Sequence, residues 1–312
     1  MPGDIITAQD QYESALKLIE IMGGTLSPVA YEGSAKRAAA FDEMRRDVLV
    51  AIDWLREAAA QDHVEAILLL GALLTAGEGF DFLLDEAEAS KWFRQAAECG
   101  NMVAQDALAR QYRTGRGVER DDERAAHWFT KAAKQGDDDA QLALGLMYLS
   151  GEGVAQDYRK AATWVRKSAD QNNARAQFQL ALLYLNGQGV RKDVARAVTW
   201  VRIAADGDCA TARDFLGDAE TQFDLALCYL RGDGAKKNAA MAVEWAQKAA
   251  AQGYPDAQCF MGEAYSFGDG VAKNIPEAVK WYRKAAKQGN THAQGRLLVK
   301  HGLVVLGELQ EH

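Results

Sequence analysis

Apolar and polar positions recur along this chain with one long period, and a tryptophan marks each period. The spacings between successive tryptophans are 38, 36, 36, 36, 45 and 36 residues. The seven tryptophans are Trp54, Trp92, Trp128, Trp164, Trp200, Trp245 and Trp281. A fixed period of this length is typical of repeat arrays, in which each unit must stack on its neighbours to bury its apolar face.

Each tryptophan lies in a predicted helix with constant flanking residues. Three residues before it is always Ala, and four after it is Ala or, once, Ser168. These spacings place the three residues on one helical face, so the ring is expected between two small residues that let neighbouring helices approach closely. Seven residues before each tryptophan is a predicted N-cap: Asp47, Asp85, Asp121, Asp157, Asp193, Asn238 and Asn274. Eight residues after each is a predicted left-handed helix end: Asp62, Gly100, Gly136, Asn172, Asp208, Gly253 and Gly289.

A second helix is predicted between each of these ends and the next Gly-x-Gly triplet. It begins with Ala-Gln in five repeats and with Thr221-Gln222 in one, and an apolar anchor follows three residues after the Gln. A small residue and then a tyrosine usually come next. Six Gly-x-Gly turns join this helix to the tryptophan helix: Gly77/Gly79, Gly115/Gly117, Gly151/Gly153, Gly187/Gly189, Gly232/Gly234 and Gly268/Gly270. The predicted unit is therefore helix A, a Gly-x-Gly turn, helix B and a tight turn.

The stretch AQLALGLMYLSGEGVAQDYRKAATWVRKSA, residues 140–169, resembles the Sel-like repeat (SLR) family, which is related to the tetratricopeptide repeat. The same pattern recurs at five further places, and the resemblance covers residues 34–301. It implies an all-α fold, a right-handed α-α superhelix or solenoid of about six to seven helix-turn-helix repeats. It also implies a role in protein–protein contact, often as an adaptor.

Three segments depart from the period. The 45-residue interval holds nine extra residues near 208–216, which predict a short helix or turn at 208–217. The 38-residue interval places Phe80–Leu84 in a turn, where these residues either pack on the preceding helix or contact a partner. Residues 1–33 are expected to form a capping helix, at 9–22, and a loop. Residues 302–312 are expected to cap the other end, although Leu303–Leu306 could instead support self-association.

Composition narrows the possible functions. The hydrophobic fraction of 48% and charged fraction of 26% suit a folded globular chain. The net charge of −8 disfavours general affinity for nucleic acid or anionic membrane, and the first 140 residues carry most of the negative charge. No secretory signal and no long apolar span are evident, which predicts a cytoplasmic protein without a membrane span. The four cysteines lack metal-type spacing and are interpreted as small apolar residues.

The sequence predicts no catalytic residue, no cofactor site and no metal site. It contains neither a P-loop nor an HExxH motif, and the Gly-x-Gly triplets join two helices, unlike a dinucleotide fingerprint. The acidic runs Asp121–Glu123 and Asp137–Asp139 lie at predicted helix starts, where they complement the helix dipole; the alternative is a cation site. A catalytic triad assembled in space remains the basis of a weaker hydrolase hypothesis.

The binding surface is predicted on helix A, which the family resemblance places on the concave wall. Counted from the Gln, positions +2, +5, +6 and +9 form one stripe and change from repeat to repeat. Either +5 or +6 must face inward, which makes Leu182, Leu183 and Leu227 candidates for the core. The predicted contact residues are Arg110, Gln111, Thr114, Met147, Ser150, Gln179, Asn186, Asp224, Arg231, Phe260, Glu263 and Phe267. Phe260 and Phe267, two helical turns apart, are of most interest because aromatic anchors dominate interfaces; alternatively, the terminal segment covers them.

Two functions follow from these patterns. The first is a non-enzymatic scaffold or adaptor that binds a protein partner or peptide segment in the groove, as a monomer or weak homodimer. The second is an immunity or inhibitor protein that neutralises a toxic enzyme. The acidic first half of the chain would suit a basic effector in that second role.

Overall fold

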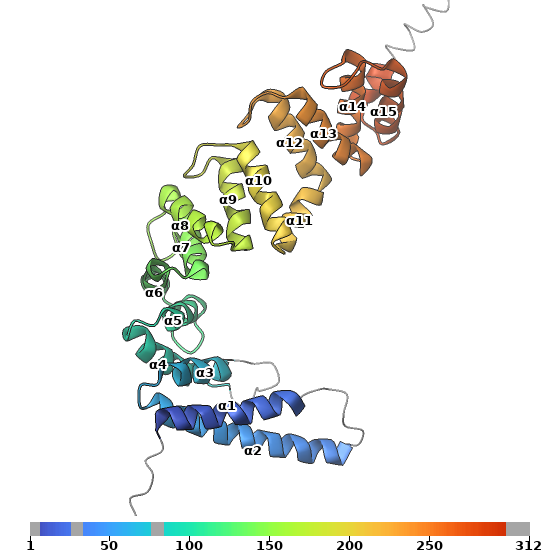
Figure 1. Ribbon diagram of the computed structural model, residues 1–312. Coiled ribbons are helices and arrows are strands. Elements are labelled where there is room, and N and C mark those ends of the chain that lie inside the picture. The colour runs from blue at the N-terminus through green and yellow to red at the C-terminus, as the bar shows by residue number, and fades with distance from the viewer. Residues whose placement is uncertain (1–6, 26–33, 76–83, 298–312) are drawn as a thin grey trace, which may run out of the picture. The chain divides into compact units, whose positions relative to one another are not determined.

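The computed structural model describes residues 7–25, 34–75 and 84–297, and over these ranges the chain is helical with no strand. The all-α prediction is therefore confirmed. The helices in Figure 1 are α1 (Ala8–Thr25), α2 (Ser34–Ala59), α3 (Val64–Thr75), α4 (Glu86–Glu98), α5 (Met102–Thr114), α6 (Asp122–Gln135), α7 (Asp138–Ser150), α8 (Tyr158–Asp170), α9 (Ala174–Asn186), α10 (Val194–Asp206), α11 (Ala210–Gly217), α12 (Ala219–Arg231), α13 (Ala239–Ala251), α14 (Pro255–Phe267) and α15 (Ile275–Lys287). A further helical segment begins at residue 291.

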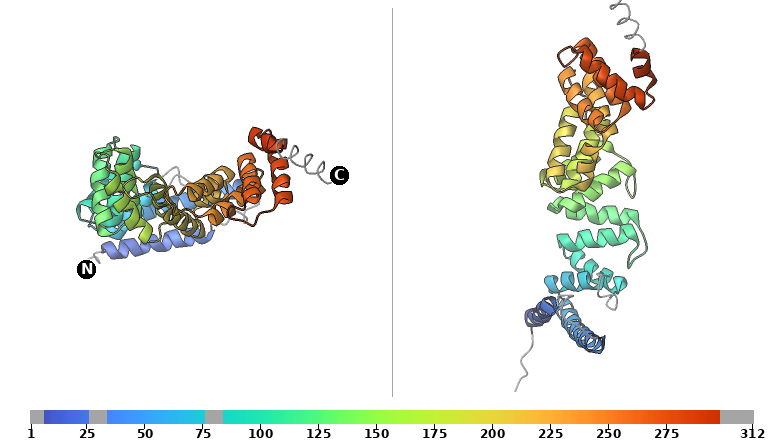
Figure 2. Two further views of the ribbon diagram at one scale, coloured as in Figure 1. Left: turned by 90° about the horizontal axis from the view of Figure 1, so that it is seen from above. Right: turned by 90° about the vertical axis from the view of Figure 1, so that its right-hand side faces the viewer.

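The chain divides into two compact units, Met1–Asp157 and Tyr158–His312. In the first unit, α1 packs on α2, α3 on α4 and α5 on α6, and each pair contacts the next helix along the chain. In the second unit, the pairs are α9 with α10, α12 with α13 and α14 with α15. Figure 2 shows these antiparallel pairs from two further directions. We call α3, α5, α7, α9, α12 and α14 the A helices, and α4, α6, α8, α10, α13 and α15 the B helices.

The predicted helix ends are largely confirmed. Side-chain oxygens of Asp85, Asp121, Asp193, Asn238 and Asn274 accept the backbone N–H three residues on, at 2.8–3.1 Å. All seven tight-turn residues have positive φ, including three that are not glycine: Asp62, Asn172 and Asp208. The Asp47 cap was wrong, because α2 runs unbroken through that position. Residues 34–46 are rich in Ala, Arg, Lys and Glu and contain no Gly-x-Gly turn, so nothing stops the helix before Asp47.

The second glycine of the Gly-x-Gly turn lies against the B helix of the preceding repeat. A Cβ placed on Gly117 would come within 1.9 Å of the Glu86 carbonyl oxygen, and one on Gly153 within 2.0 Å of that of Asp122. The same approach occurs in the second unit, where Gly189 faces the Tyr158 carbonyl. These glycines also have positive φ, so both space and backbone conformation exclude a side chain.

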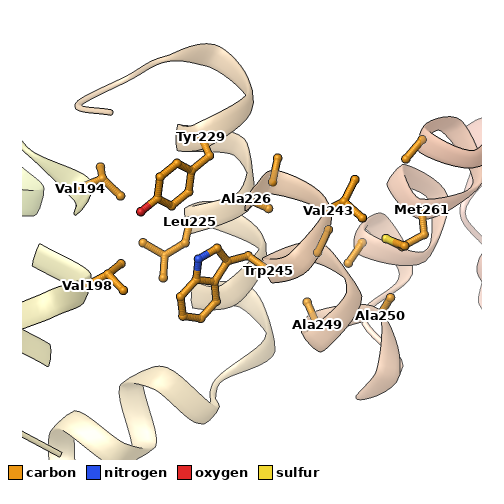
Figure 3. Packing of buried hydrophobic residues seen from close by; sticks show 14 residues of the cluster. Val194, Val198, Leu225, Ala226, Tyr229, Val243, Trp245, Ala249, Ala250 and Met261 are labelled. Atoms are coloured by element: carbon orange, nitrogen blue, oxygen red, sulfur yellow. The ribbon is translucent and has the colours of Figure 1, made fainter. Parts of the chain in front are cut away.

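The core of each helix pair is formed by the small residues that flank the tryptophan and by the residue that directly follows it. The residues three before and four after each tryptophan are at most 1% exposed. The residue directly after the tryptophan is buried in every repeat, as with Phe129 and Tyr282, whereas the tryptophans are half-buried except for Trp245. Four of the rings carry a lysine ammonium 4.2 Å from the ring centroid, three residues further along the helix. In Figure 3, Leu225 of α12 and Trp245 of α13 face Val194 and Val198 of α10, while Met261 of α14 lies on the other side of α13.

The Gln at the start of helix A is buried in α5, α7, α9, α12 and α14, and in these helices its side chain bonds to the segment before it, whereas Gln294 is exposed. The Gln105 side-chain amide donates to the Ala97 carbonyl at 3.1 Å, and its oxygen accepts from Gln135 at 2.8 Å. Gln258 is bonded in the same way, to Ala250 and Gln288. Because these buried amides are satisfied, they fasten the tight turn between B and the next A helix without leaving an unpaired polar group.

The structure also resolves most of the departures from the period. The extra residues near 208–217 form α11, and the predicted helix at 9–22 corresponds to α1. Of the turn at Phe80–Leu84, only Leu84 lies within the described residues, and it is exposed. The segment 302–312 lies outside them.

Position +6 of the A helices faces inward, which corrects two of the predicted contact residues. Gln111 is 6% exposed and Met147 is 2% exposed, in the same register as the buried Leu183. Both polar atoms of the Gln111 side chain are buried, with no hydrogen-bond partner among the described residues. A period of 3.6 residues turns +6 toward the B helices when +2, +5 and +9 face away.

Gly153→Ala should lower stability more than Gly100→Ala. Both positions have positive φ, which costs an L-residue about 1–2 kcal/mol. Only Gly153 adds a clash with a backbone carbonyl, since no atom lies within 4 Å of a Cβ at Gly100. We expect a further loss of about 1–3 kcal/mol, measured by urea unfolding. Equal losses in the two variants would refute the stacking role of the second glycine.

Gln111→Met should raise the unfolding free energy by about 1 kcal/mol, because it removes a buried amide that lacks hydrogen-bond partners. The methionine should fit, since Met147 occupies the corresponding buried position in the next repeat. The matched substitution Gln105→Met should instead lower it by about 1–3 kcal/mol, since it breaks two hydrogen bonds. Denaturant midpoints of the two variants should move in opposite directions. Destabilisation by both would show that the Gln111 amide is satisfied in solution.

Candidate partner-binding surface

Ten of the twelve predicted contact residues remain on the surface of the A helices. We call positions +2, +5 and +9 of α5, α7, α9, α12 and α14 the A-helix face. Position +9 is the last residue of each helix, immediately before the capping glycine, and it is exposed in all five repeats. Position +5 is half-buried in all five. The members at +9 are Thr114, Ser150, Asn186, Arg231 and Phe267.

In the first unit, Arg110 is held by two carboxylates. Its Nε lies 2.6 Å from Asp106 Oδ2 on the same helix, and its Nη2 lies 3.3 Å from Asp139 Oδ2 on α7. Burial raises the pKa of Asp106, and the bond from Arg110 partly opposes this rise. The second oxygen of Asp106 is buried without a partner in the described part of the chain. Arg110 therefore ties two A helices together and is only partly available to a partner.

A hollow of about 610 Å³ lies beside the end of α7. Its lining combines apolar and polar side chains: Arg113, Leu146, Met147, Leu149, Ser150 and Glu152. Ser150 is on the rim, with its hydroxyl donating to the Leu146 carbonyl at 3.2 Å. Met147 lines the hollow although little of its surface is exposed. An apolar floor with a polar rim suits a side chain from another protein.

In the second unit, the aromatic pair lies on α14. Phe260 is half-buried and meets Phe223 of α12 edge to face, with ring centroids 6.1 Å apart. Phe267 is 61% exposed, more than any other large hydrophobic residue in the described ranges. The Arg296 guanidinium lies 5.6 Å from its ring centroid. Residues 291–297 thus contact Phe267 on one side and leave most of the ring exposed.

Glu263, between the two aromatics, is engaged by the same terminal segment. Its carboxylate accepts from Arg296 Nη2 at 3.0 Å and lies 2.9 Å from His292 Nε2. On the neighbouring A helices, Asn186, Asp224 and Arg231 are exposed, and Gln179 on α9 is half-buried. Within each unit the candidates occupy separate positions on successive A helices, rather than a converging cluster of reactive groups.

The chemistry of the remaining reactive groups is consistent with structural roles. Burial raises the pKa of Cys259 to about 11, and burial also raises the pKa of Cys228. Both thiols are therefore held in the neutral form, which is a poor nucleophile. Within the described ranges no group of three or more His, Cys, Asp or Glu side chains is arranged to hold a metal ion. No helix among them is long and apolar enough to cross a membrane.

The chain is similar to several solved structures. The protein c5321, a protective antigen present in uropathogenic Escherichia coli strains and displaying an SLR fold, is 31% identical over 93% of this chain, with a TM-score of 0.54. A Sel1 repeat protein from Oxalobacter formigenes is 32% identical over 71% of this chain and 84% of its own, with a TM-score of 0.43. The immunity protein Pa5087 from Pseudomonas aeruginosa is 19% identical over 73% of this chain and 85% of its own, with a TM-score of 0.35. This chain spans 63% of the length of c5321. A comparison with curated protein sequences gave no match.

The model of one family, described as Sel1 repeat, matches seven successive segments: 41–63, 64–101, 103–137, 138–173, 174–209, 219–254 and 255–290. These segments follow the helix pairs seen in the structure, and the gap at 210–218 coincides with α11. With most of the chain matched, and a relative 31% identical over 93% of it, the protein belongs to the Sel1 repeat family.

Proposed function

We propose that this protein is a non-catalytic scaffold or adaptor that binds a protein partner along the A-helix face. Sel1 repeat proteins are generally protein-interaction scaffolds. The observation that carries the proposal for this chain is Phe267, a large aromatic side chain 61% exposed at the end of α14. Exposed aromatic rings are enriched among the residues that contribute most to binding between proteins.

The distribution of constant and variable positions supports this function. Glycines, alanines and the bridging glutamines occupy the contacts between helices, and they recur in each repeat. Position +9 carries a different side chain in each of the five repeats and is exposed. Positions +2 and +5 vary less, since Ala recurs at Ala107 and the buried Ala143, and Leu recurs at Leu146, Leu182 and Leu227. A surface of this kind can be matched to a partner without disturbing the core. Its mixture of aromatic, amide and charged groups suits a folded protein or a peptide segment.

A triple variant, Asn186→Ala, Arg231→Ala and Phe267→Ala, should weaken partner binding by about ten-fold or more while leaving the helical content unchanged. Arg110 is kept in this variant, because removing it would leave the buried Asp106 carboxylate without its cation. The matched control replaces exposed residues of the B helices: Ile203→Ala, Gln247→Ala and Lys287→Ala.

The partner is first captured from the native lysate, identified by mass spectrometry and purified. Calorimetry should then show affinity reduced by about ten-fold or more in the triple variant, in line with the loss of an aromatic anchor, and unchanged in the control. An affinity that the triple variant retains in full would refute the A-helix face as the binding surface.

A second candidate function is inhibition of a basic toxic enzyme, and the charge of the first unit favours it. Residues 1–157 contain 28 acidic and 15 basic residues, a net charge of −13 within a chain whose total is −8. A strongly negative surface attracts a positively charged partner and raises the rate of association.

Co-expression with the neighbouring open reading frame, as the source of a candidate toxic enzyme, tests this second function. Wild-type chain should rescue growth, and Glu98→Gln, Glu119→Gln, Glu123→Gln should rescue it less well, because three exposed charges are lost from the first unit. A control with three exposed acids of the second unit neutralised, Asp214→Asn, Glu220→Gln, Asp269→Asn, should rescue fully. Absence of rescue by the wild-type chain would exclude inhibition of that enzyme.

A further inference from the structure

The second unit contains a large hollow that is separate from the A-helix face. It measures about 810 Å³, and three successive repeats contribute its walls. Arg166 comes from α8, Tyr184 from α9, and Arg196 from the first turn of α10. The remaining lining comes from residues 190–195 and from the next repeat at 232–236. None of the A-helix face residues lines it.

The lining of this hollow is strongly cationic. Five of its side chains are basic, namely Arg166, Arg191, Lys192, Arg196 and Lys236, and one is acidic, Asp193. Arg196 pairs with Asp193 at 3.2 Å, and Lys192 pairs with Asp233 at 2.7 Å. The other three cations have no carboxylate partner within the part of the chain that the structure describes.

Tyr184 positions two of the arginines. The Arg166 guanidinium donates to the Tyr184 hydroxyl, and its Cζ lies 5.6 Å from the centroid of the ring. The Arg196 Cζ lies 5.8 Å from the same centroid. The far wall is fixed by the backbone, since the Val194 N–H donates to the Gly234 carbonyl at 2.7 Å. The hollow is therefore formed in advance, which reduces the conformational entropy that a ligand must remove on binding.

The fold does not require these charges. The two residues that precede the B-helix cap are Arg191-Lys192 and Lys236-Lys237 in these two repeats, but Ala155-Gln156 and Ala272-Lys273 in others. The corresponding hollow of the first unit, about 360 Å³, has the same arginine-to-tyrosine bond, from Arg94 to Tyr112. It balances three arginines against Glu119 and Asp121. The excess of positive charge is thus a property of one hollow rather than of the repeat.

We propose that the 810 Å³ hollow is a second binding site and that it takes an acidic peptide segment of a partner protein. Guanidinium groups pair with carboxylates through two parallel hydrogen bonds, so several arginines suit several Asp or Glu side chains. The five cations come from three stretches of chain, at Arg166, at 191–196 and at Lys236, and they line a hollow of about 810 Å³, which is wider than a single phosphate requires. Gly232, Gly234 and Ala235 line the hollow without adding long side chains of their own.

Fluorescence anisotropy with the full chain tests this site. The probe is a fluorescein-labelled eight-residue peptide with six glutamates, and its matched control carries glutamine at the same six positions. We expect the glutamate peptide to bind about ten-fold more tightly or better, and its affinity to fall as salt rises from about 50 to about 200 mM, because surface charges are screened. The Asn186→Ala, Arg231→Ala, Phe267→Ala variant should bind the peptide as the wild type does, which separates this site from the A-helix face.

Two charge-matched variants localise the binding. Arg166→Gln, Arg191→Gln, Lys236→Gln should weaken binding by about ten-fold or more, since each lost ion pair with a peptide carboxylate contributes a fraction of a kcal/mol or more. Lys273→Gln, Arg283→Gln, Lys287→Gln removes the same charge elsewhere in the second unit and should change affinity by less than about two-fold. If the first variant loses helicity, Arg191→Gln, Lys236→Gln keeps the Arg166–Tyr184 bond and should still weaken binding. Equal weakening by the hollow and control variants, or displacement of the peptide by millimolar inorganic phosphate, would overturn the proposal.

Discussion

The close approach of two backbones at the second glycine of four Gly-x-Gly turns, Gly117, Gly153, Gly189 and Gly270, is the contact on which the array depends. At Gly117, Gly153 and Gly189 a Cβ would lie within about 2 Å of a carbonyl oxygen at the start of the preceding B helix. Each of these repeats therefore contacts the backbone of the preceding repeat directly. The position of one repeat against the other is set by this backbone contact rather than by the surrounding side chains. Elsewhere the same principle sets residue size, since Gly71 lies against Phe93 and Gly262 against Tyr282. At both places an aromatic ring packs against a residue whose side chain is only a hydrogen atom.

Because backbone and small-residue contacts hold the repeats together, two kinds of surface remain as candidates for recognition. The ends of the A helices project a different side chain from each repeat, with Phe267 the most prominent. The Gly-x-Gly turns and the B-helix starts form hollows between successive repeats, and their charge is set by two or three variable turn residues. The first surface combines apolar and polar groups, whereas the second is cationic in the second unit. If both proposed surfaces bind proteins, the acidic first unit and the more basic second unit favour partners of different charge.

Much of the fold follows from sequence because helix caps, left-handed ends and small residues have direct conformational causes. The exceptions have physical reasons. The spacing of alanines fits both the tryptophan and the residue after it, so periodicity alone does not reveal that Phe129 or Tyr282, rather than the indole, lies deepest. Gln111 is polar yet points inward, because its register, not its polarity, fixes its direction. The cationic hollow was not predictable, since it brings together Arg166 and Lys236, which are 70 positions apart in sequence.

The placement of α11 has a bearing on how such chains change in length. Its extra residues enter at the tight turn between one repeat and the next, where α10 and α12 each keep their own partner helix. The Gly-x-Gly turns on either side retain their usual spacing to the tryptophans that follow. An insertion at this tight turn therefore leaves both flanking helix pairs intact. At a Gly-x-Gly turn, the residues after the second glycine can vary in number, as the longer turn at Phe80–Leu84 indicates, whereas a residue added before that glycine would displace it from the carbonyl it faces.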